Sequence, residues 1–191
     1  MLRWTPALIA VAALATPLQA QDSVECTQNT YTEAQKQKIA EILPRFTGDV
    51  AAEEAANIEL GDSAGGVVDI CAQEHGWTAE EKELAAVFEF SRLREVAFRQ
   101  HGPMPAQDIA KLDAALAKGD RTALWQAMEN QVLVGYTGEP SPTEQQDITI
   151  LGAFLIGLGY AFQNDKNEQF GMLMGFMALQ RYGKREFAAL Q

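Results

Sequence analysis

The segment Ile148–Phe162 reads ITILGAFLIGLGYAF and contains one aliphatic hydroxyl, that of Thr149, and no charged residue. A helix that is apolar on every side must be buried in protein or in lipid. The start of such a helix is marked by Ser141 as an N-cap, by Pro142 at the first helical position and by Glu144, which completes a capping box. These signals predict one buried helix over residues 142–163, with the rest of the chain packed around it.

A second apolar segment, Phe170–Leu179, belongs to a last helix that we predict over residues 166–182, ending at Gly183. Small residues recur at helical spacing in both helices, and small residues in register allow two backbones to approach closely. We therefore expect an antiparallel hairpin in which the two small-residue edges touch. The residues concerned are Ala153, Gly157 and Ala161 in the first helix and Gly171, Gly175 and Ala178 in the second.

The length of this hairpin helps to distinguish a soluble core from a membrane-inserting structure. The fifteen residues of Ile148–Phe162 span about 22 Å as an α-helix, whereas the hydrocarbon core of a bilayer is about 30 Å thick. The turn between the two helices also carries Asp165, Lys166 and Glu168. We therefore predict the core of a soluble bundle without membrane insertion, and a membrane-acting hairpin is the alternative.

Helical spacing of apolar residues accounts for most of the remaining chain. Thr32 is the predicted cap of the first of these helices, Thr78 and Glu81 form a capping box before the longest, and Gly61 separates two short ones. The expected fold class is all-α: a single-domain bundle of about seven helices around the buried C-terminal hairpin, over residues 32–191. The predicted helices before the hairpin cover residues 32–43, 50–60, 63–74, 79–101, 106–118 and 120–134.

The N-terminus has the pattern of a secretory signal peptide. Arg3 supplies a positive charge, Trp4–Leu14 is almost entirely apolar, and the small residue Ala20 suits a cleavage site. The apolar run is too short for a membrane span, which disfavours an uncleaved anchor. We expect residues 1–20 to be removed near Ala20, residues 21–31 to form a polar tail, and the protein to be periplasmic or secreted.

The chain contains two cysteines, Cys26 and Cys71. Export places them in an oxidising compartment, where an even number of cysteines indicates a disulfide. The alternatives are two buried thiols or a redox pair, but redox pairs normally have Cys-x-x-Cys spacing, which is absent here. We predict a structural disulfide that fixes the N-terminal tail to the helix containing Cys71.

The net charge is −11 at pH 7. A chain of this charge repels nucleic acid and anionic lipid at long range. We therefore expect no nucleic-acid partner. The acidity also keeps the chain soluble, which is an ordinary reason for such a composition.

A set of charged residues interrupts the otherwise apolar helix over residues 79–101. Glu89 and Arg92 have i,i+3 spacing, and Glu95 and Arg99 have i,i+4 spacing, so surface ion pairs are the simplest interpretation. The alternative is a half-buried cluster that binds a carboxylate or phosphate. The candidate ligand-binding residues under that alternative are Arg92, Glu95 and Arg99, with Arg94 nearby.

The methionines of the last helix suggest a hydrophobic ligand. Met172, Met174 and Met177 point in several directions around the helix, so they cannot all be ordinary core residues. Methionine adapts to ligands of variable shape. Met172 and Met174 are therefore candidate ligand-binding residues in an apolar pocket beside the hairpin. If Gly157 does not contact the last helix, it lines an open groove instead, which would favour the same interpretation.

The remaining residue patterns give no sign of catalysis. His75 and His101 each precede a glycine at a predicted helix end, which is an ordinary helix ending, so we expect no metal site. No nucleophile motif, P-loop or dinucleotide fingerprint is present, so we expect no catalytic residue and no cofactor.

These patterns favour a non-catalytic, exported helical protein that binds a protein partner or a hydrophobic ligand. Two alternatives stay open: a small-anion binder or enzyme built on the charged cluster of residues 79–101, and a membrane-acting hairpin. The absence of catalytic motifs favours the first function only weakly, because helical enzymes often lack linear motifs.

Overall fold

The structure is a computed structural model that describes residues 23–138, 140–160 and 165–191. Over these residues it contains eight α-helices, one short 3-10 helix and no strand, which confirms the all-α fold. The predicted signal peptide and its cleavage point lie outside the described residues. The elements are α1 (Cys26–Asn29), α2 (Glu33–Ile42), η1 (Leu43–Arg45), α3 (Val50–His75), α4 (Ala79–His101), α5 (Ala106–Leu116), α6 (Thr122–Thr137), α7 (Glu144–Gly157) and α8 (Asp165–Leu190).

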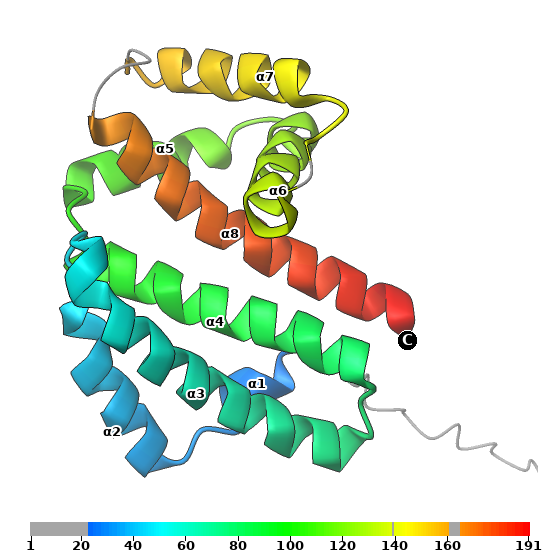
Figure 1. The fold of residues 1–191 in the computed structure, drawn as a ribbon. Coiled ribbons are helices and arrows are strands. Elements are labelled where there is room, and N and C mark those ends of the chain that lie inside the picture. The colour runs from blue at the N-terminus through cyan, green and yellow to red at the C-terminus, as the bar shows by residue number, and fades with distance from the viewer. Residues whose placement is uncertain (1–22, 139, 161–164) are drawn as a thin grey trace, which may run out of the picture.

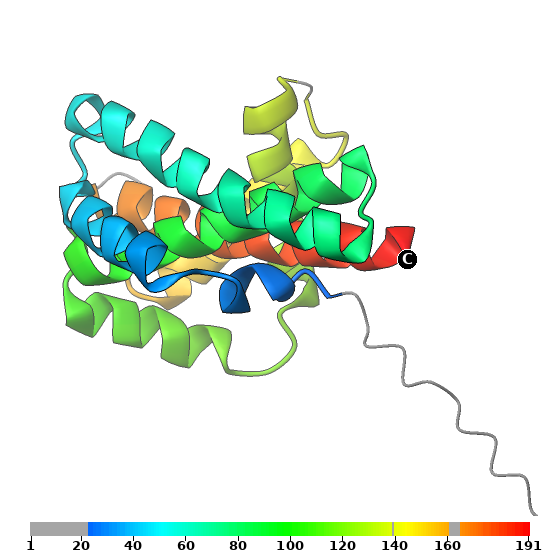
Figure 2. The ribbon, with the colours of Figure 1, turned by 90° about the horizontal axis from the view of Figure 1, so that it is seen from below.

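Two long antiparallel helices, α4 and α8, form the centre of the bundle (Figures 1 and 2). Helices α1, α2 and α3 cover one side of α4, and α5, α6 and α7 gather around the first half of α8 (Figure 1). The apolar core follows this division, because Leu93 and Ala97 pack with α2 and α3, whereas Phe98 packs with α5, α6 and α8. Helix α4 therefore joins the two halves of the molecule.

Helices α8 and α4 approach each other closely where they cross at Gly183. A Cβ atom at Gly183 would lie 2.8 Å from the carbonyl oxygen of Leu84 and 3.1 Å from the backbone nitrogen of Phe88. A helix backbone comes this near another only where a side chain is missing. The sequence-based prediction that Gly183 ends the helix is wrong, because α8 continues to Leu190. The missing side chain of Gly183 instead allows the backbones of α8 and α4 to approach each other.

Helix α7 differs from the buried central helix that the sequence predicts. It covers residues 144–157 rather than 142–163, and it ends before Gly159, which has a positive φ of 80°. One face of the helix packs on the core, but Ile148 is 41% exposed and Ile156 is 60% exposed. The prediction of burial on all sides is therefore wrong. Among the described residues, no helix is both long enough and apolar enough to span a membrane.

The predicted close contact between the glycine and alanine edges of the hairpin is also wrong. A Cβ atom at Gly157 or Gly171 would have no neighbouring atom within 4 Å. At Gly175 the nearest atom is Cγ2 of Val132, at 3.6 Å, so the neighbour of α8 at this point is α6 and not α7. Ala161, which we expected at the same edge, lies outside the described residues.

The helix starts at Thr32 and Thr78 agree with the sequence, since each threonine closes a capping box, with Gln35 and Glu81 respectively. The predicted box of Ser141 and Glu144 is absent: α7 begins at Glu144 after an N-cap at Thr143.

Helix α3 is continuous, so Gly61 does not separate two short helices as predicted. A glycine inside a helix costs about 1 kcal/mol. Complete or nearly complete burial of the neighbouring side chains of Leu60 and Ala64 offsets that cost.

The N-terminal residues pack more closely than a polar tail would. Val24 and Thr27 are buried, and Cys26 is joined to Cys71 of α3 across a separation of 45 residues, which confirms the predicted disulfide. Closing a loop of this size stabilises the fold by about 4 kcal/mol in the chain-entropy model.

Replacing Gly183 by alanine should destabilise the protein by about 1–3 kcal/mol, because the added methyl group overpacks the α4–α8 crossing. Gly171 is the matched control, since it lies inside the same helix with open space at its Cβ position. Gly171→Ala should stabilise the protein by about 0.5–1 kcal/mol through its helix propensity. Urea unfolding of both variants measures the two effects. A Gly183→Ala variant as stable as the wild type would contradict the close crossing.

Candidate functional site

The carboxylate of Glu89 lies in the centre of the bundle and is 0% exposed. It accepts hydrogen bonds from Tyr31 Oη at 2.7 Å, Thr27 Oγ1 at 3.0 Å, and Arg92 Nε and Nη2 at 2.9 and 2.6 Å. Burial and the negative charge of Glu89 both raise the pKa of Tyr31, so the phenol stays protonated and donates. The pair Glu89–Arg92 therefore ties α4 to the N-terminal segment and is not a surface pair.

The guanidinium of Arg94 is buried on another side of α4. Its Nη2 donates to Glu53 at 3.1 Å, and its Cζ lies 4.0 Å from the ring centroid of Phe46 and 5.0 Å from that of Phe176. Glu53 also accepts from the backbone nitrogen of Gly48 at 2.7 Å. This ion pair holds the start of α3 against the middle of α4.

Arg99 and Glu95 form the second predicted pair on α4. Arg99 Nε donates to Glu95 at 2.6 Å, and its two terminal nitrogens each donate to Asp113 of α5 at 3.0 Å. Glu95 also accepts from Gln180 of α8 at 2.6 Å. The ion pairs of α4 thus connect this helix to its neighbours. Arg92 and Arg99, the arginines expected to bind an anion, already pair with carboxylates of the same chain.

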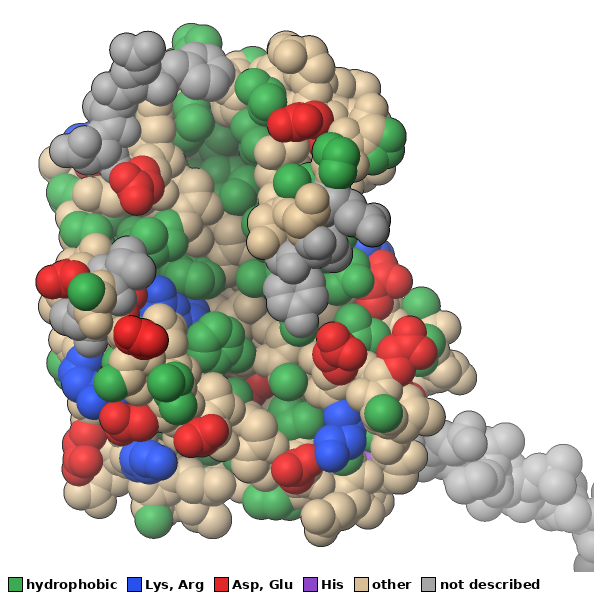
Figure 3. All heavy atoms as spheres, in the orientation of Figure 1, with side chains coloured by type: hydrophobic (Ala, Val, Ile, Leu, Met, Phe, Trp, Pro, Cys, Tyr) green, Lys and Arg blue, Asp and Glu red, His purple; other side chains and the backbone are tan. Residues whose placement is uncertain are grey.

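The two candidate methionines lie at different depths. Met174 is 2% exposed and belongs to the core of α8, while Met172 is partly buried and packs against that core. Figure 3 shows hydrophobic side chains in a hollow bordered by α6, α7 and α8. Gly171, one turn before the α6 contact at Gly175, has open space at its Cβ position. Helix α8 is therefore not fully covered on this side.

A groove of about 300 Å³ lies between the C-terminal parts of α5 and α7. Its surface is mostly apolar, and the two charged residues that line it are both basic, in a chain whose net charge is −11. A volume near 300 Å³ is at the lower end of the range for small-molecule sites. We call this feature the α5–α7 groove; it is lined by Ala115, Lys118, Arg121, Ala153, Phe154, Gly157 and Leu158.

The shape of the α5–α7 groove depends on Gly157 and Arg121. No atom lies within 4 Å of a Cβ position at Gly157, so the glycine leaves the groove open. Arg121 donates from Nη2 and Nε to the carbonyl oxygen of Ala115 at 2.8 and 3.1 Å, and its Cζ lies 5.6 Å from the ring centroid of Phe154. The guanidinium is thus held in place at the edge of an apolar surface.

Two buried carboxylates hold α7 at its ends. Asp147 in its first turn is 4% exposed and accepts from Asn130 of α6 at 3.1 Å. Beyond its last turn, Tyr160 donates to Asp108 of α5 at 2.6 Å, and Lys166 of α8 donates to the same carboxylate at 2.8 Å. These contacts position α7 over α5 and α6, so the groove beside it has fixed walls.

The structure brings together only part of what the sequence indicated as a site. Arg92, Glu95 and Arg99 are engaged in internal ion pairs, and Met174 lies in the core. The basic residues of the α5–α7 groove were missed, because residues 106–118 have the pattern of an ordinary amphipathic helix. Gly157 was the one signal for the groove, since a glycine inside an apolar helix needs a reason.

The chain matches no known protein-family model, and comparisons with curated proteins and with solved structures found no similar protein.

Replacing Glu89 by alanine should destabilise the protein by about 3–5 kcal/mol, because Arg92 loses its buried partner. Glu33, which pairs with Lys36 at the surface, is the matched control. Glu33→Ala should change the stability by less than about 1 kcal/mol. Thermal and urea unfolding give both values, and equal effects of the two substitutions would argue against a central role for Glu89.

The contribution of Asp108 to stability should depend on pH. Hydrogen bonds from Lys166 and Tyr160 hold the pKa of Asp108 below its ordinary value, and the bond to Asp108 raises the pKa of Tyr160 to about 12. Because the folded-state pKa lies below the unfolded value of about 3.9, the stabilisation is complete above that value and is lost as the pH falls through the folded pKa.

Urea unfolding near pH 6 and near pH 3 should therefore show Asp108→Asn less stable than the wild type at the higher pH, with the difference shrinking at the lower. Asp62→Asn, at an exposed position on α3, is the control. A difference between wild type and Asp108→Asn that does not change with pH would refute this role of the carboxylate.

Proposed function

We propose that this chain is a non-catalytic exported protein that binds an apolar small molecule carrying an acidic group in the α5–α7 groove. The observation that carries the proposal is an apolar groove of about 300 Å³ whose two charged lining residues, Lys118 and Arg121, are both basic. Apolar walls with a few placed polar groups are typical of small-molecule sites. Export is proposed from the signal-peptide pattern of residues 1–20 and agrees with the Cys26–Cys71 disulfide.

The charge of the groove favours an acidic ligand. Lys118 is exposed, and Arg121 is partly buried beside the apolar wall. Lys111 lies nearby, with its Nζ 4.8 Å from the ring centroid of Tyr160 just beyond α7. A carboxylate at the groove mouth would meet these cations, while its apolar chain would cover Phe154 and Leu158.

The contacts on α4 give no comparable support to an anion site there, because each arginine concerned already pairs with a carboxylate of the same chain. At the α5–α7 groove, in contrast, the open space at Gly157 leaves room for a ligand beside the basic residues.

Dodecanoate is a suitable probe, and dodecanol is its neutral counterpart. Isothermal titration calorimetry should show that dodecanoate binds more tightly than dodecanol. Lys118→Gln should reduce this preference by roughly tenfold, which corresponds to about 1.4 kcal/mol for the loss of one charged contact.

Gly157→Leu tests the location of the probe. The leucine has room to enter the groove, so it should leave the unfolding temperature nearly unchanged while abolishing dodecanoate binding. Gly61→Leu in α3, also with open space at its Cβ position, is the matched control and should bind the probe as the wild type does. The proposal fails if dodecanoate does not bind the wild type, or if Gly157→Leu binds it with wild-type affinity.

A further inference from the structure

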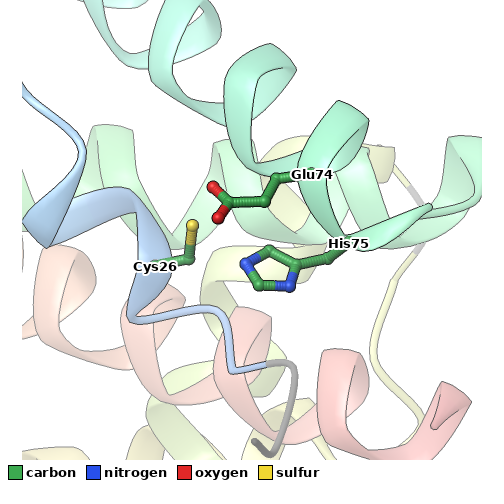
Figure 4. Close-up of side chains that lie close together, drawn as sticks. All are labelled: Cys26, Glu74 and His75. Atoms are coloured by element: carbon green, nitrogen blue, oxygen red, sulfur yellow. The ribbon is translucent and has the colours of Figure 1, made fainter.

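Three metal-ligating side chains converge at the C-terminal end of α3. The Sγ atom of Cys26, a carboxylate oxygen of Glu74 and an imidazole nitrogen of His75 all lie within 4.8 Å of one another (Figure 4). Cys26 comes from α1, whereas Glu74 and His75 are the last two residues of α3. The predicted disulfide already placed Cys26 beside this helix, but His75 was interpreted as an ordinary helix ending and was not connected with the cysteine.

A fourth ligand-forming group belongs to the same place. Cys71 is bonded to Cys26, and it lies on α3 three residues before Glu74 and four before His75. Residues at these spacings share one face of a helix. The Sγ atom of Cys71 is bonded to that of Cys26, so a second sulfur lies beside the three converging ligand atoms.

The two sulfurs are not metal ligands while they are bonded to each other, because the thiolate is the ligand form of cysteine. A dithiol reductant would transfer two electrons and two protons to the disulfide, giving two thiols and leaving the reductant as its own disulfide. Each thiol would then release its proton on binding a metal ion. Thiolate, imidazole and carboxylate in a set of four are the ligands that Zn²⁺ takes.

We propose that the reduced protein binds one Zn²⁺ ion through Cys26, Cys71, Glu74 and His75. The disulfide would then link α1 to α3 in the oxidised protein, and the metal ion would link them at the same place in the reduced protein. Glu74 is exposed and Cys26 and His75 are partly exposed, so an ion reaches the site from solvent. The ring of His75 stacks on Trp77 with centroids 6.0 Å apart, which restricts the orientation of the imidazole.

Cobalt(II) is the probe for this site, because its thiolate complexes absorb light and it adopts the same tetrahedral geometry as zinc. Titration of the reduced wild-type protein should produce a thiolate-to-cobalt charge-transfer band that saturates at one equivalent and is abolished by added Zn²⁺. The oxidised protein should give no such band. Absence of the band in the reduced protein would overturn the proposal.

Histidine and glutamate variants separate this site from chelation by two thiols alone. His75→Asn and Glu74→Gln should each weaken cobalt binding by roughly tenfold or more, since loss of even an outer-shell partner costs about 10- to 100-fold. His101→Asn is the matched control, because His101 also ends a helix, is exposed and precedes a glycine.

Circular dichroism of each reduced variant shows whether the chain stays folded. Wild-type affinity in His75→Asn and Glu74→Gln would overturn the four-ligand site, whether the reduced chain is folded or not, because thiols alone would then account for the binding.

Discussion

The crossing of α4 and α8 at Gly183 is the constraint on which the rest of the structure depends. A backbone-to-backbone approach of this kind fixes the distance and the register of two long helices at once, since sliding either helix would bring a side chain into the gap. With α4 and α8 fixed, helices α1, α2 and α3 pack on one side of α4. Helices α5, α6 and α7 pack around the first half of α8. Because Leu93 and Ala97 of α4 pack with α2 and α3 while α8 packs with α5 and α6, the crossing determines how the two halves meet.

The buried charges of α4 favour one register of this helix against its neighbours. Glu89 and Arg94 lie deep in the bundle, where an ionised group without a partner is strongly unfavourable. Each finds its partners on a different neighbouring element: Glu89 on the N-terminal segment and Arg94 on α3. A shifted packing of α4 would separate Arg94 from Glu53 and would remove the hydroxyl donors of Tyr31 and Thr27 from Glu89. The native register is therefore favoured over alternatives more than the ion pairs stabilise it in absolute terms.

Local signals in the sequence predicted the fold class, the cap at Thr32, the capping box at Thr78 and the disulfide, because these depend on nearby residues or on the number of cysteines. The position of α7 could not be predicted in the same way. An apolar run indicates burial, but it does not say whether a helix lies in the centre or against one side of the core. Glycines were similarly ambiguous: Gly183 permits a close crossing, Gly157 leaves a groove open, and Gly61 is simply tolerated inside α3. The charged residues of α4 were correctly paired along the helix, yet their partners on other elements required the fold.

Helix α7 is held at both ends although part of its apolar surface is exposed to solvent. Its ends are held by Asp147 and by the contact of Tyr160 with Asp108, so the helix stays in place without being covered on every side. An apolar residue left in water forgoes about 25 cal/mol for each Å² that burial would remove, and Ile156 is 60% exposed. The residues of α7 and its C-cap that line the α5–α7 groove include Phe154 and Leu158, and under the proposed function a ligand would cover these two side chains. Under the same proposal, Lys118 and Arg121 would favour ligands with an acidic group over fully apolar ones, and the open space at Gly157 would accommodate such a molecule.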